Sequence, residues 1–464
     1  MRKKVYVLVT MAIVLVLLIG TVVILIKNPA PADSSSGVSS AVPEITVLKI
    51  DKATIDEVSG INSAGSFAIK RKDSDNFTVK GKETIPVDSY YVDAIVGDVS
   101  ELKANLNVTE SASNIAEYGL DKPSINVTVK TADKTEYNLL FGNKTVNGDY
   151  YFKLGSSDAV YVVASNITDD FNKTNLGLYS KTIAADVTAD TITDVNLKKA
   201  GSDTISYKKM ETTASTTASS SVYNEEFKLL SPFEYTGDSD VISVVNTSIA
   251  SLYATSAETD DFSAANLKKY GLDKPEYTLD YTYSSKTITL YFSKKVGNDY
   301  SFYLKDRPLI YKIAATSAAF LEKTVSDLCY KLLYSMDIKS VAKLKIEGGG
   351  KSYLFELTGS DTDNMTVKYN GSDINAANFR KLYKNVILAQ QNGSASKPNT
   401  QSKYKISFNL KDGYTDVLEF YEVDSRNLFA SVKGTGHFTV SVTRLEKIMA
   451  DAEKLIAGQD IAVG

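Results

Sequence analysis

A six-residue sequence that occurs twice constrains the fold of this chain more than any other feature. Residues 118–123 and 270–275 both read Tyr-Gly-Leu-Asp-Lys-Pro, and similar sequence follows each copy. Self-similarity of this kind is typical of chains built from repeated structural units. The length of 464 residues also exceeds what one hydrophobic core usually organises. We therefore expect several modules of one plan.

The positions of the hexapeptide have backbone roles that explain it without a catalytic site. Gly119 follows a short helical stretch and can adopt the left-handed conformation that ends a helix. In a Schellman motif, Leu120 would then pack onto Ile115, and Leu267 has the matching position in the second copy. Pro123 prevents the helix from resuming. We interpret the hexapeptide as a helix stop followed by a turn into the next strand.

Periodicity predicts the same order of elements in three stretches of the chain. Residues 43–183, 184–335 and 336–464 each show strands with alternating apolar and polar residues, a helix, further strands and a closing helix. Hairpin-linked strands with intervening helices indicate an α+β fold with mostly antiparallel sheets. The third module is divergent, because the polar loop 391–402 replaces the hexapeptide.

Some predicted elements are specific enough for the structure to test. The closing helix of the second module is expected over residues 317–333, with Cys329 in its apolar stripe. A capping box at 443–446 is expected to start the last helix. The Ser- and Thr-rich stretch 212–221 is interpreted as a surface loop, and residues 348–350 as a tight hairpin.

An apolar segment near the N-terminus predicts attachment to a membrane. Residues 5–26 carry no charged side chain, and a helix of that length extends about 33 Å, enough to cross the hydrocarbon core of a bilayer. Basic residues 2–4 precede the segment and only Lys27 follows closely, so the N-terminus is expected in the cytoplasm. We expect residues 1–27 to form a cytoplasmic stub and transmembrane anchor, and residues 28–42 a flexible linker to an extracellular body.

A cleaved signal peptide is the alternative interpretation of this segment. Ala30-Pro31-Ala32 has the small-x-small pattern of a cleavage site. The apolar core of a signal peptide usually has about 7 to 15 residues, however, and proline inside the site is unfavourable. The longer segment favours an uncleaved, single-pass protein of the cell membrane that contacts the lipid bilayer through residues 5–26.

Composition excludes several classes of function. The formal net charge of −4 leaves no basic footprint for nucleic acid. Cys329 is the only cysteine, so an intrachain disulfide is impossible, and with His437 as the only histidine an ordinary zinc site is excluded. A catalytic triad would have to use His437, which no second signal supports. We predict no catalytic, cofactor-binding or metal-binding residue.

Two short segments resemble known ligand loops but lack their defining residues. Residues 142–145 resemble the end of a phosphate-binding loop, without the upstream glycine and with strands on both sides. Residues 360–364 resemble a calcium loop, without the glycine and terminal glutamate that such a loop needs. We interpret both as structural, and no cofactor is expected.

The repeated hexapeptide belongs to a longer pattern. A strand follows each copy, then an Asn-Gly or Gly-Asn hairpin with Asp-Tyr after it, and then a strand of the Val-Tyr-Val-Val type. This pattern resembles the bacterial family DUF4340 over the first two modules, and less closely over the third. The resemblance implies one N-terminal membrane helix, a β-rich extracytoplasmic body and no assigned activity. It also implies a partner, because such proteins are often encoded beside ABC-transporter components of the gliding-type auxiliary class.

These observations favour a non-enzymatic, membrane-tethered protein that binds another protein, with an ABC-transporter component as the expected partner. Two alternatives stay open. The body could bind cell-wall glycan or another ligand through exposed tyrosines, although the chain has no tryptophan. It could also be a hydrolase that uses carboxylates, for which a pocket lined by paired Asp or Glu with raised pKa would be the sign.

Overall fold

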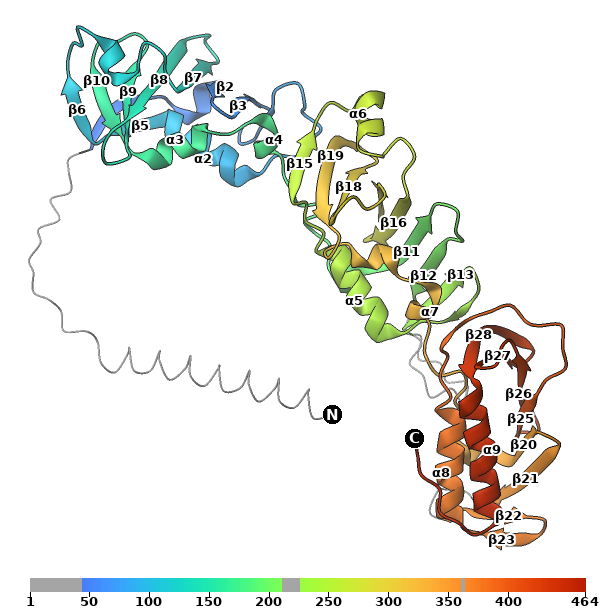
Figure 1. Ribbon diagram of the computed structural model, residues 1–464. Helices are drawn as coiled ribbons and strands as arrows, with labels where there is room; N and C mark the ends of the chain where they lie inside the picture. Colours follow the sequence, from blue (N-terminus) through green and yellow to red (C-terminus); the bar gives the residue numbers. More distant parts are fainter. Residues whose placement is uncertain (1–43, 211–225, 360–363) are drawn as a thin grey trace, which may run out of the picture.

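The computed structural model describes residues 44–210, 226–359 and 364–464. Three large sheets follow one another along the chain and form a curved row in Figure 1. The predicted anchor over 5–26 and the predicted loop over 212–221 lie outside the described residues. Within the part of the chain that the structure describes, no helix is long and apolar enough to cross a membrane.

The first module contains an eight-stranded sheet in the order β4-β3-β2-β7-β8-β9-β10-β6, beside a two-stranded sheet of β1 and β5. Its main helix begins after Asp88, whose side chain caps the helix by accepting a hydrogen bond from the backbone N–H of Tyr90. The elements are β1 (Ile45–Lys49), η1 (Lys52–Thr54), β2 (Ile55–Asn62), β3 (Gly65–Arg71), β4 (Phe77–Val79), α2 (Ser89–Ser100), β5 (Glu101–Ala104), β6 (Leu106–Thr109), η2 (Ile115–Tyr118), β7 (Ile125–Thr131), β8 (Glu136–Lys144), β9 (Tyr150–Leu154), β10 (Val160–Val163), α3 (Ser165–Phe171) and α4 (Asn175–Leu178).

The second module contains a nine-stranded sheet in the order β14-β13-β12-β11-β16-β17-β18-β19-β15. Asp238 caps its main helix by accepting a hydrogen bond from the N–H of Val241. The elements are η3 (Ala189–Thr191), β11 (Ile192–Lys199), β12 (Ile205–Lys209), β13 (Phe227–Ser231), β14 (Tyr235–Thr236), α5 (Ser239–Ala250), β15 (Ser256–Thr259), α6 (Ala264–Lys269), β16 (Tyr277–Tyr283), β17 (Lys286–Phe292), β18 (Asp299–Leu304), β19 (Arg307–Ala314), η4 (Ala319–Glu322) and α7 (Val325–Leu328).

The third module contains a nine-stranded sheet in the order β23-β22-β21-β20-β25-β26-β27-β28-β24. Two long helices, α8 and α9, lie side by side against it (Figure 1). The elements are η5 (Ile338–Ser340), β20 (Val341–Gly348), β21 (Lys351–Thr358), β22 (Thr366–Tyr369), β23 (Ser372–Ile374), α8 (Ala376–Ile387), β24 (Gly393–Ser394), β25 (Tyr404–Leu410), β26 (Thr415–Glu422), β27 (Asn427–Val432), β28 (Thr435–Ser441) and α9 (Val442–Ile456).

The three sheets have equivalent strand orders. In each, the strand that opens the sheet lies in its middle, so β2 pairs with β7, β11 with β16, and β20 with β25, all antiparallel. A short strand that follows the first long helix forms the far edge: β6, β15 and β24 pair with β10, β19 and β28. The predicted α+β class with mostly antiparallel sheets is confirmed. Equivalent topology also extends to the third module, which lacks the hexapeptide.

Each hydrophobic core lies between a sheet and its helices. In β7, Ile125, Val127 and Val129 are buried and the residues between them are more exposed, as the alternation predicts. Phenylalanine pairs fill equivalent positions across neighbouring strands. Phe141 and Phe152 lie 5.0 Å apart between ring centroids, and the matching pair in the second module lies 5.3 Å apart. Besides burying apolar area, such ring pairs favour one register of the two strands.

The predicted closing helix over residues 317–333 is wrong. The segment instead contains the short helices η4 and α7, separated by extended backbone at Lys323 and Thr324. Thr324 and Asp327 form a capping box that starts a new helix there. From Cys329 onward the chain is extended and pairs with neighbouring segments. Phe320, Leu321 and Leu328 are buried, as their apolar spacing indicates, but they lie in two short helices and not in one long helix.

The predicted capping box at 443–446 is also wrong. Helix α9 begins at Val442, and its N-cap residue, Ser441, makes no side-chain hydrogen bond to the helix backbone. The Ser441 hydroxyl instead lies 2.6 Å from the Thr443 hydroxyl. Strand β28 leads directly into α9, so the position of the strand determines where the helix begins. The hairpin predicted at 348–350 is confirmed between β20 and β21, with φ of 58° and 77° at its last two glycines.

Candidate functional site

The hexapeptide ends a helical segment in both copies, as predicted. Gly119 has a φ of 71°, and the N–H of Leu120 bonds to the carbonyl oxygen of Ile115 at 3.1 Å. The second copy repeats this bond, from Leu272 to Leu267 at 2.7 Å. This is the six-to-one bond of the Schellman motif. Both following leucines are 2 % exposed, so the motif anchors each loop onto its sheet.

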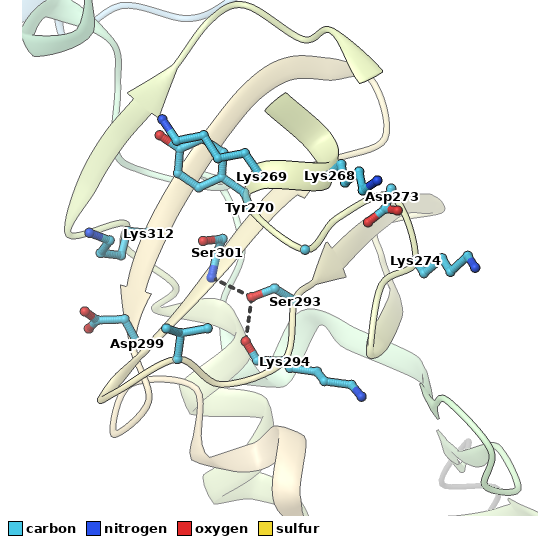
Figure 2. Close-up of a pocket in the computed structure, with 12 residues that line it drawn as sticks. Lys268, Lys269, Tyr270, Asp273, Lys274, Ser293, Lys294, Asp299, Ser301 and Lys312 are labelled. Carbon is cyan, nitrogen blue, oxygen red and sulfur yellow. Dashed lines mark hydrogen bonds between the residues drawn. The ribbon is translucent and has the colours of Figure 1, made fainter. Parts of the chain in front are cut away.

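Figure 2 shows a pocket beside the second hexapeptide, with a volume of about 560 Å³. Tyr270 and Gly271 form one side of it. Ser293, at the end of β17, and Ser301, in β18, form another. The Ser301 N–H donates to the Ser293 hydroxyl at 3.0 Å, and that hydroxyl donates to the carbonyl of Lys294 at 2.8 Å. The Ser293 hydroxyl and the Ser301 N–H are therefore satisfied within the protein.

The first and second modules meet at residues 178–183, the end of α4 and the extended chain after it, which we call the first joint. It pairs with the start of the main helix of its own module and with the chain after the main helix of the next. The backbone hydrogen bonds are Asp88 N to Leu178 O (2.8 Å), Ser180 N to Pro86 O (2.9 Å), Ala254 N to Lys181 O (2.8 Å) and Ile183 N to Leu252 O (3.4 Å).

The second joint, residues 328–333, repeats this arrangement between the second and third modules. Its backbone hydrogen bonds are Asp238 N to Leu328 O (2.8 Å), Tyr330 N to Thr236 O (3.0 Å), Gln391 N to Lys331 O (2.8 Å) and Leu333 N to Ala389 O (3.0 Å). The four donors and four acceptors have the same places in both joints. The modules are thus attached to one another by one repeated backbone pattern.

Side chains reinforce each joint in different ways. At the first, Arg307 donates to the carbonyl oxygens of Thr182 and Ile183 at 3.3 and 3.2 Å. At the second, the Gln391 amide donates to several carbonyl oxygens of the joint and accepts from the Ser326 hydroxyl at 2.6 Å. The Phe233 ring of the second module also stacks on the His437 ring of the third, with centroids 3.5 Å apart. The two interfaces share a backbone frame and differ in side chains.

A second repeated sequence marks these joints, and the sequence analysis missed it. Residues 173–181 and 323–331 both fit Lys-Thr-x-x-x-Leu-x-x-Lys. The threonine caps a short helix in each copy, accepting from the N–H of Gly177 or Asp327. The leucine is buried, and the following lysine carbonyl bonds to the next module. The pattern was available in the sequence, but only the structure shows that it positions two modules.

The structure gives His437 and Cys329 packing roles. His437 lies in β28 with its ring against Phe233, and burial lowers its pKa. Cys329 is fully buried in the second joint, and burial raises its pKa to about 12. It does not lie in a helical stripe as predicted, although its burial is confirmed. Among the described residues, no group of three or more His, Cys, Asp or Glu could hold a metal ion.

One carboxylate pair has a raised pKa. Burial, and then the charge of Asp170, raise the pKa of Asp98 to about 7. Asp98 lies on α2 and Asp170 on α3, and a hydrogen bond between the two carboxyl groups adds to the shift at Asp98. Neither residue lines the pocket of Figure 2 or the two further pockets of about 410 and 440 Å³. A carboxylate-based hydrolase would need its acid in a substrate cavity, and these three pockets do not provide one for this pair.

The segment 142–145 ends β8 and enters a hairpin, so it is not a phosphate-binding loop. Close packing explains the glycine at position 142, because a Cβ atom there would come within 2.1 Å of the Tyr118 carbonyl oxygen. The hexapeptide loop thus lies directly on this strand. Most of the segment that resembles a calcium loop and was interpreted as structural, residues 360–363, lies outside the described residues.

The fold and the joints define a repeat protein, in which antiparallel α+β modules are attached in series. Two regions of the chain, residues 78–246 and 228–407, match the family model described as Domain of unknown function (DUF4340). Together they span residues 78–407, more than half of the chain, and the protein belongs to the DUF4340 family. No curated protein matches the chain. Each matched region begins in one module and ends in the next, so the matched unit contains a joint.

Proposed function

We propose that this protein is a non-enzymatic arm, tethered to a membrane through residues 5–26, that holds its modules at fixed positions for binding another protein. The proposed body is extracytoplasmic, on the basis of the charges around that segment. The proposed partner is a protein of the same membrane, and an ABC-transporter component is the partner to test first.

The observation that carries this proposal is the repetition of the joint. Modules linked only by flexible chain would reorient freely, and each would bind alone. Here four backbone hydrogen bonds recur at both joints, at 2.8 to 3.4 Å and 2.8 to 3.0 Å. Repeat proteins with such neighbour contacts present extended surfaces made by several units together. A catalytic role would not need equivalent joints, whereas an extended binding surface does.

The test is capture of the partner from membranes. The full-length chain, tagged at its C-terminus, is cross-linked in cells and purified from solubilised membranes, and the captured proteins are identified by mass spectrometry. We expect a transporter subunit among them. Recovery of no membrane protein above an untagged control would contradict the proposal.

A joint variant makes the test specific to module spacing. Insertion of Gly-Ser after Thr182 shifts the first joint out of register, so that its bonds to the second module cannot form together. The matched control carries the same insertion after Ser219, in the low-complexity stretch. We expect capture to fall for the joint insertion and to stay at the wild-type level for the control. Equal capture by both would show that spacing is irrelevant to binding.

Glycan binding has one observation in its favour. Tyr291 and Tyr303 lie on neighbouring strands with half-buried rings 4.9 Å apart, and Phe262 packs edge-on against Tyr303. Half-exposed rings of this kind can stack on sugars. A pull-down with purified wall material separates this alternative from the first, because Tyr303→Ala would then abolish retention of the protein while leaving capture of the membrane partner unchanged.

A further inference from the structure

The pocket of Figure 2 is rimmed by lysines, and three of them have no ion-pair partner among the described residues. Lys268 and Lys269 end α6, and Lys274 belongs to the second hexapeptide. Two further lysines, Lys294 and Lys312, approach glutamates only at 3.8 and 3.6 Å. Elsewhere in the second module, Lys199, Lys209 and Lys228 each pair with one glutamate, whereas five lysines gather around this one pocket.

Acidic groups near the pocket cancel most of the positive charge of these lysines, but not all of it. Asp273 and Asp299 line it, and Glu276 and Glu258 are the distant partners of Lys294 and Lys312. Two of the five lysines thus pair with these glutamates, and the other three face two aspartates, which leaves one net positive charge at the rim. Figure 2 shows Lys269 and Tyr270 on one side of the two serines, and Lys312 with Asp299 on another.

The first module provides an internal comparison, because its equivalent pocket is filled. Tyr151 occupies the place of Ser301, as the pairing of each with its neighbouring strand shows, and its ring packs on Tyr118 at 5.0 Å. The Asn143 side chain lies where a side chain on Gly119 would go, at 2.5 Å. Around Gly271 the nearest atom to such a side chain is 3.6 Å away. The same hexapeptide therefore supports a closed site in one module and an open one in the other.

The charge differs between the two sites as well. In the first module, Ala116 and Glu117 precede the hexapeptide tyrosine where the second has Lys268 and Lys269. Val162 stands in place of Lys312, by the same strand pairing. The hexapeptide has the same structural role in both modules, so the shared fold does not explain these differences in charge. A ligand that needs space and positive charge accounts for both changes together.

We propose that this pocket binds a polyanion whose charges are phosphate groups. Its cationic rim is made of lysine alone, with no arginine among the lining residues. Lysine binds phosphate as a compact, rotatable point charge, and the planar fork with which arginine pairs bidentately with carboxylate or phosphate is not among these residues. A volume of about 560 Å³ is much larger than one phosphate group, so the site accommodates part of a chain of them.

Titration calorimetry on the purified full-length protein tests this. The probes are inorganic polyphosphate, free inorganic phosphate and polyglutamate of similar charge. We expect polyphosphate to bind, with an affinity that falls as salt is raised, and the other two probes to bind much more weakly. Equal binding of polyglutamate would overturn the choice of phosphate, and equal affinity for free phosphate would overturn the choice of a polymer.

Variants that carry residues of the first module at the matching positions locate the site. The double variant Lys268→Ala and Lys269→Glu is expected to weaken polyphosphate binding about tenfold or more, because charge-assisted contacts are lost. Ser301→Tyr is expected to weaken it by filling the pocket without a charge change. Lys286→Ala, at an exposed lysine of the same module that does not line the pocket, is the matched control. Wild-type affinity for polyphosphate in the double variant, or an equal loss of affinity in the control, would overturn the proposal. Neither outcome depends on whether the protein binds a membrane partner.

Discussion

The Tyr179 hydroxyl donates a hydrogen bond of 2.6 Å to Oδ2 of Asp260, across the joint between the first two modules. The residues are 81 positions apart in the chain. Tyr179 is 1 % exposed, and burial together with the neighbouring carboxylate raises the pKa of its hydroxyl. Lys82 also donates to the backbone carbonyl of Asp260 at 2.7 Å. The loop around Asp260 is therefore held by the first module from two sides.

Loss of the Tyr179 hydroxyl should destabilise the joint. Tyr179→Phe removes a hydrogen bond to a charged acceptor while keeping the packed ring, and we expect the free energy of unfolding to fall by about 1 to 2 kcal/mol. Urea denaturation of the full-length chain measures this. Tyr281→Phe is the control, because Tyr281 is also buried and its hydroxyl makes no hydrogen bond among those found in the described residues. An equal effect of both substitutions would contradict a role for the Tyr179–Asp260 bond.

The joints also show where sequence reasoning reaches its limit. The cap at Asp88 and the turn at Gly119 were predictable, because a few neighbouring residues determine each. The contact of Tyr179 with Asp260 was not, because no local pattern names the partner. Strand β2, in the middle of the first sheet, was missed as well. Its alternation is obscured by Glu57, which is buried against Lys80 at 2.8 Å, and by Gly60, where a side chain would collide with the Phe67 ring.

The candidate pocket was only partly visible in the sequence. Lys268 and Lys269 stand beside a motif that the sequence identifies as structural, and that interpretation is confirmed. The openness of the pocket depends on Ser301 replacing Tyr151, which can be recognised only once the strands are paired. Phe141 matches Phe292 and Tyr150 matches Tyr300, so the hairpin of the first module is one residue longer than that of the second. This difference in length hides the equivalence in the sequence.

The Asp98–Asp170 pair predicts a pH-dependent stability. An unfolded aspartate has a pKa of about 3.9, whereas burial raises that of Asp98 to about 7 in the folded protein. Between these values the folded state binds the additional proton, so the free energy of unfolding should fall as pH rises from about 4 to about 7. The pKa of Asp170 is raised too, in the same direction, although Lys173 opposes the shift.

Asp98→Asn removes the group that titrates and should flatten this dependence. At pH 7 we expect the variant to be more stable than the wild type by about 1 to 2 kcal/mol, after allowance for partial exposure to solvent. Chemical denaturation between pH 4 and pH 8 measures the slope. Asp93→Asn, at an exposed position of the same helix, should leave the slope unchanged. A wild-type slope in the Asp98 variant would contradict the assignment.

The two hexapeptide glycines should tolerate alanine unequally. Both have left-handed backbone, which costs an alanine about 1 kcal/mol. Gly119→Ala must also displace the Asn143 side chain from 2.5 Å, while Gly271→Ala meets nothing closer than 3.6 Å. We therefore expect the larger loss of stability at Gly119. Gly97→Ala, in the middle of α2 with open space around it, should instead stabilise the protein by about 0.5 to 1 kcal/mol. Thermal and urea denaturation rank the three, and the reverse order at Gly119 and Gly271 would refute the packing difference.

The single cysteine reports on the second joint. Cys329 is fully buried, and burial raises the pKa of its thiol to about 12, so the reactive thiolate is scarce at pH 8. We expect thiol reagents to label the native protein only as fast as the joint opens. Gln391→Ala removes amide hydrogen bonds to the carbonyl oxygens of Cys329 and Tyr330, at 3.4 and 3.3 Å, and should raise the labelling rate. Asn392→Ala, whose side chain bonds within the third module to Asn427 and Thr439, should not. Rapid, complete labelling of the native wild type would mean that the joint is open in solution, and the spacing on which the proposed arm depends would then not be fixed.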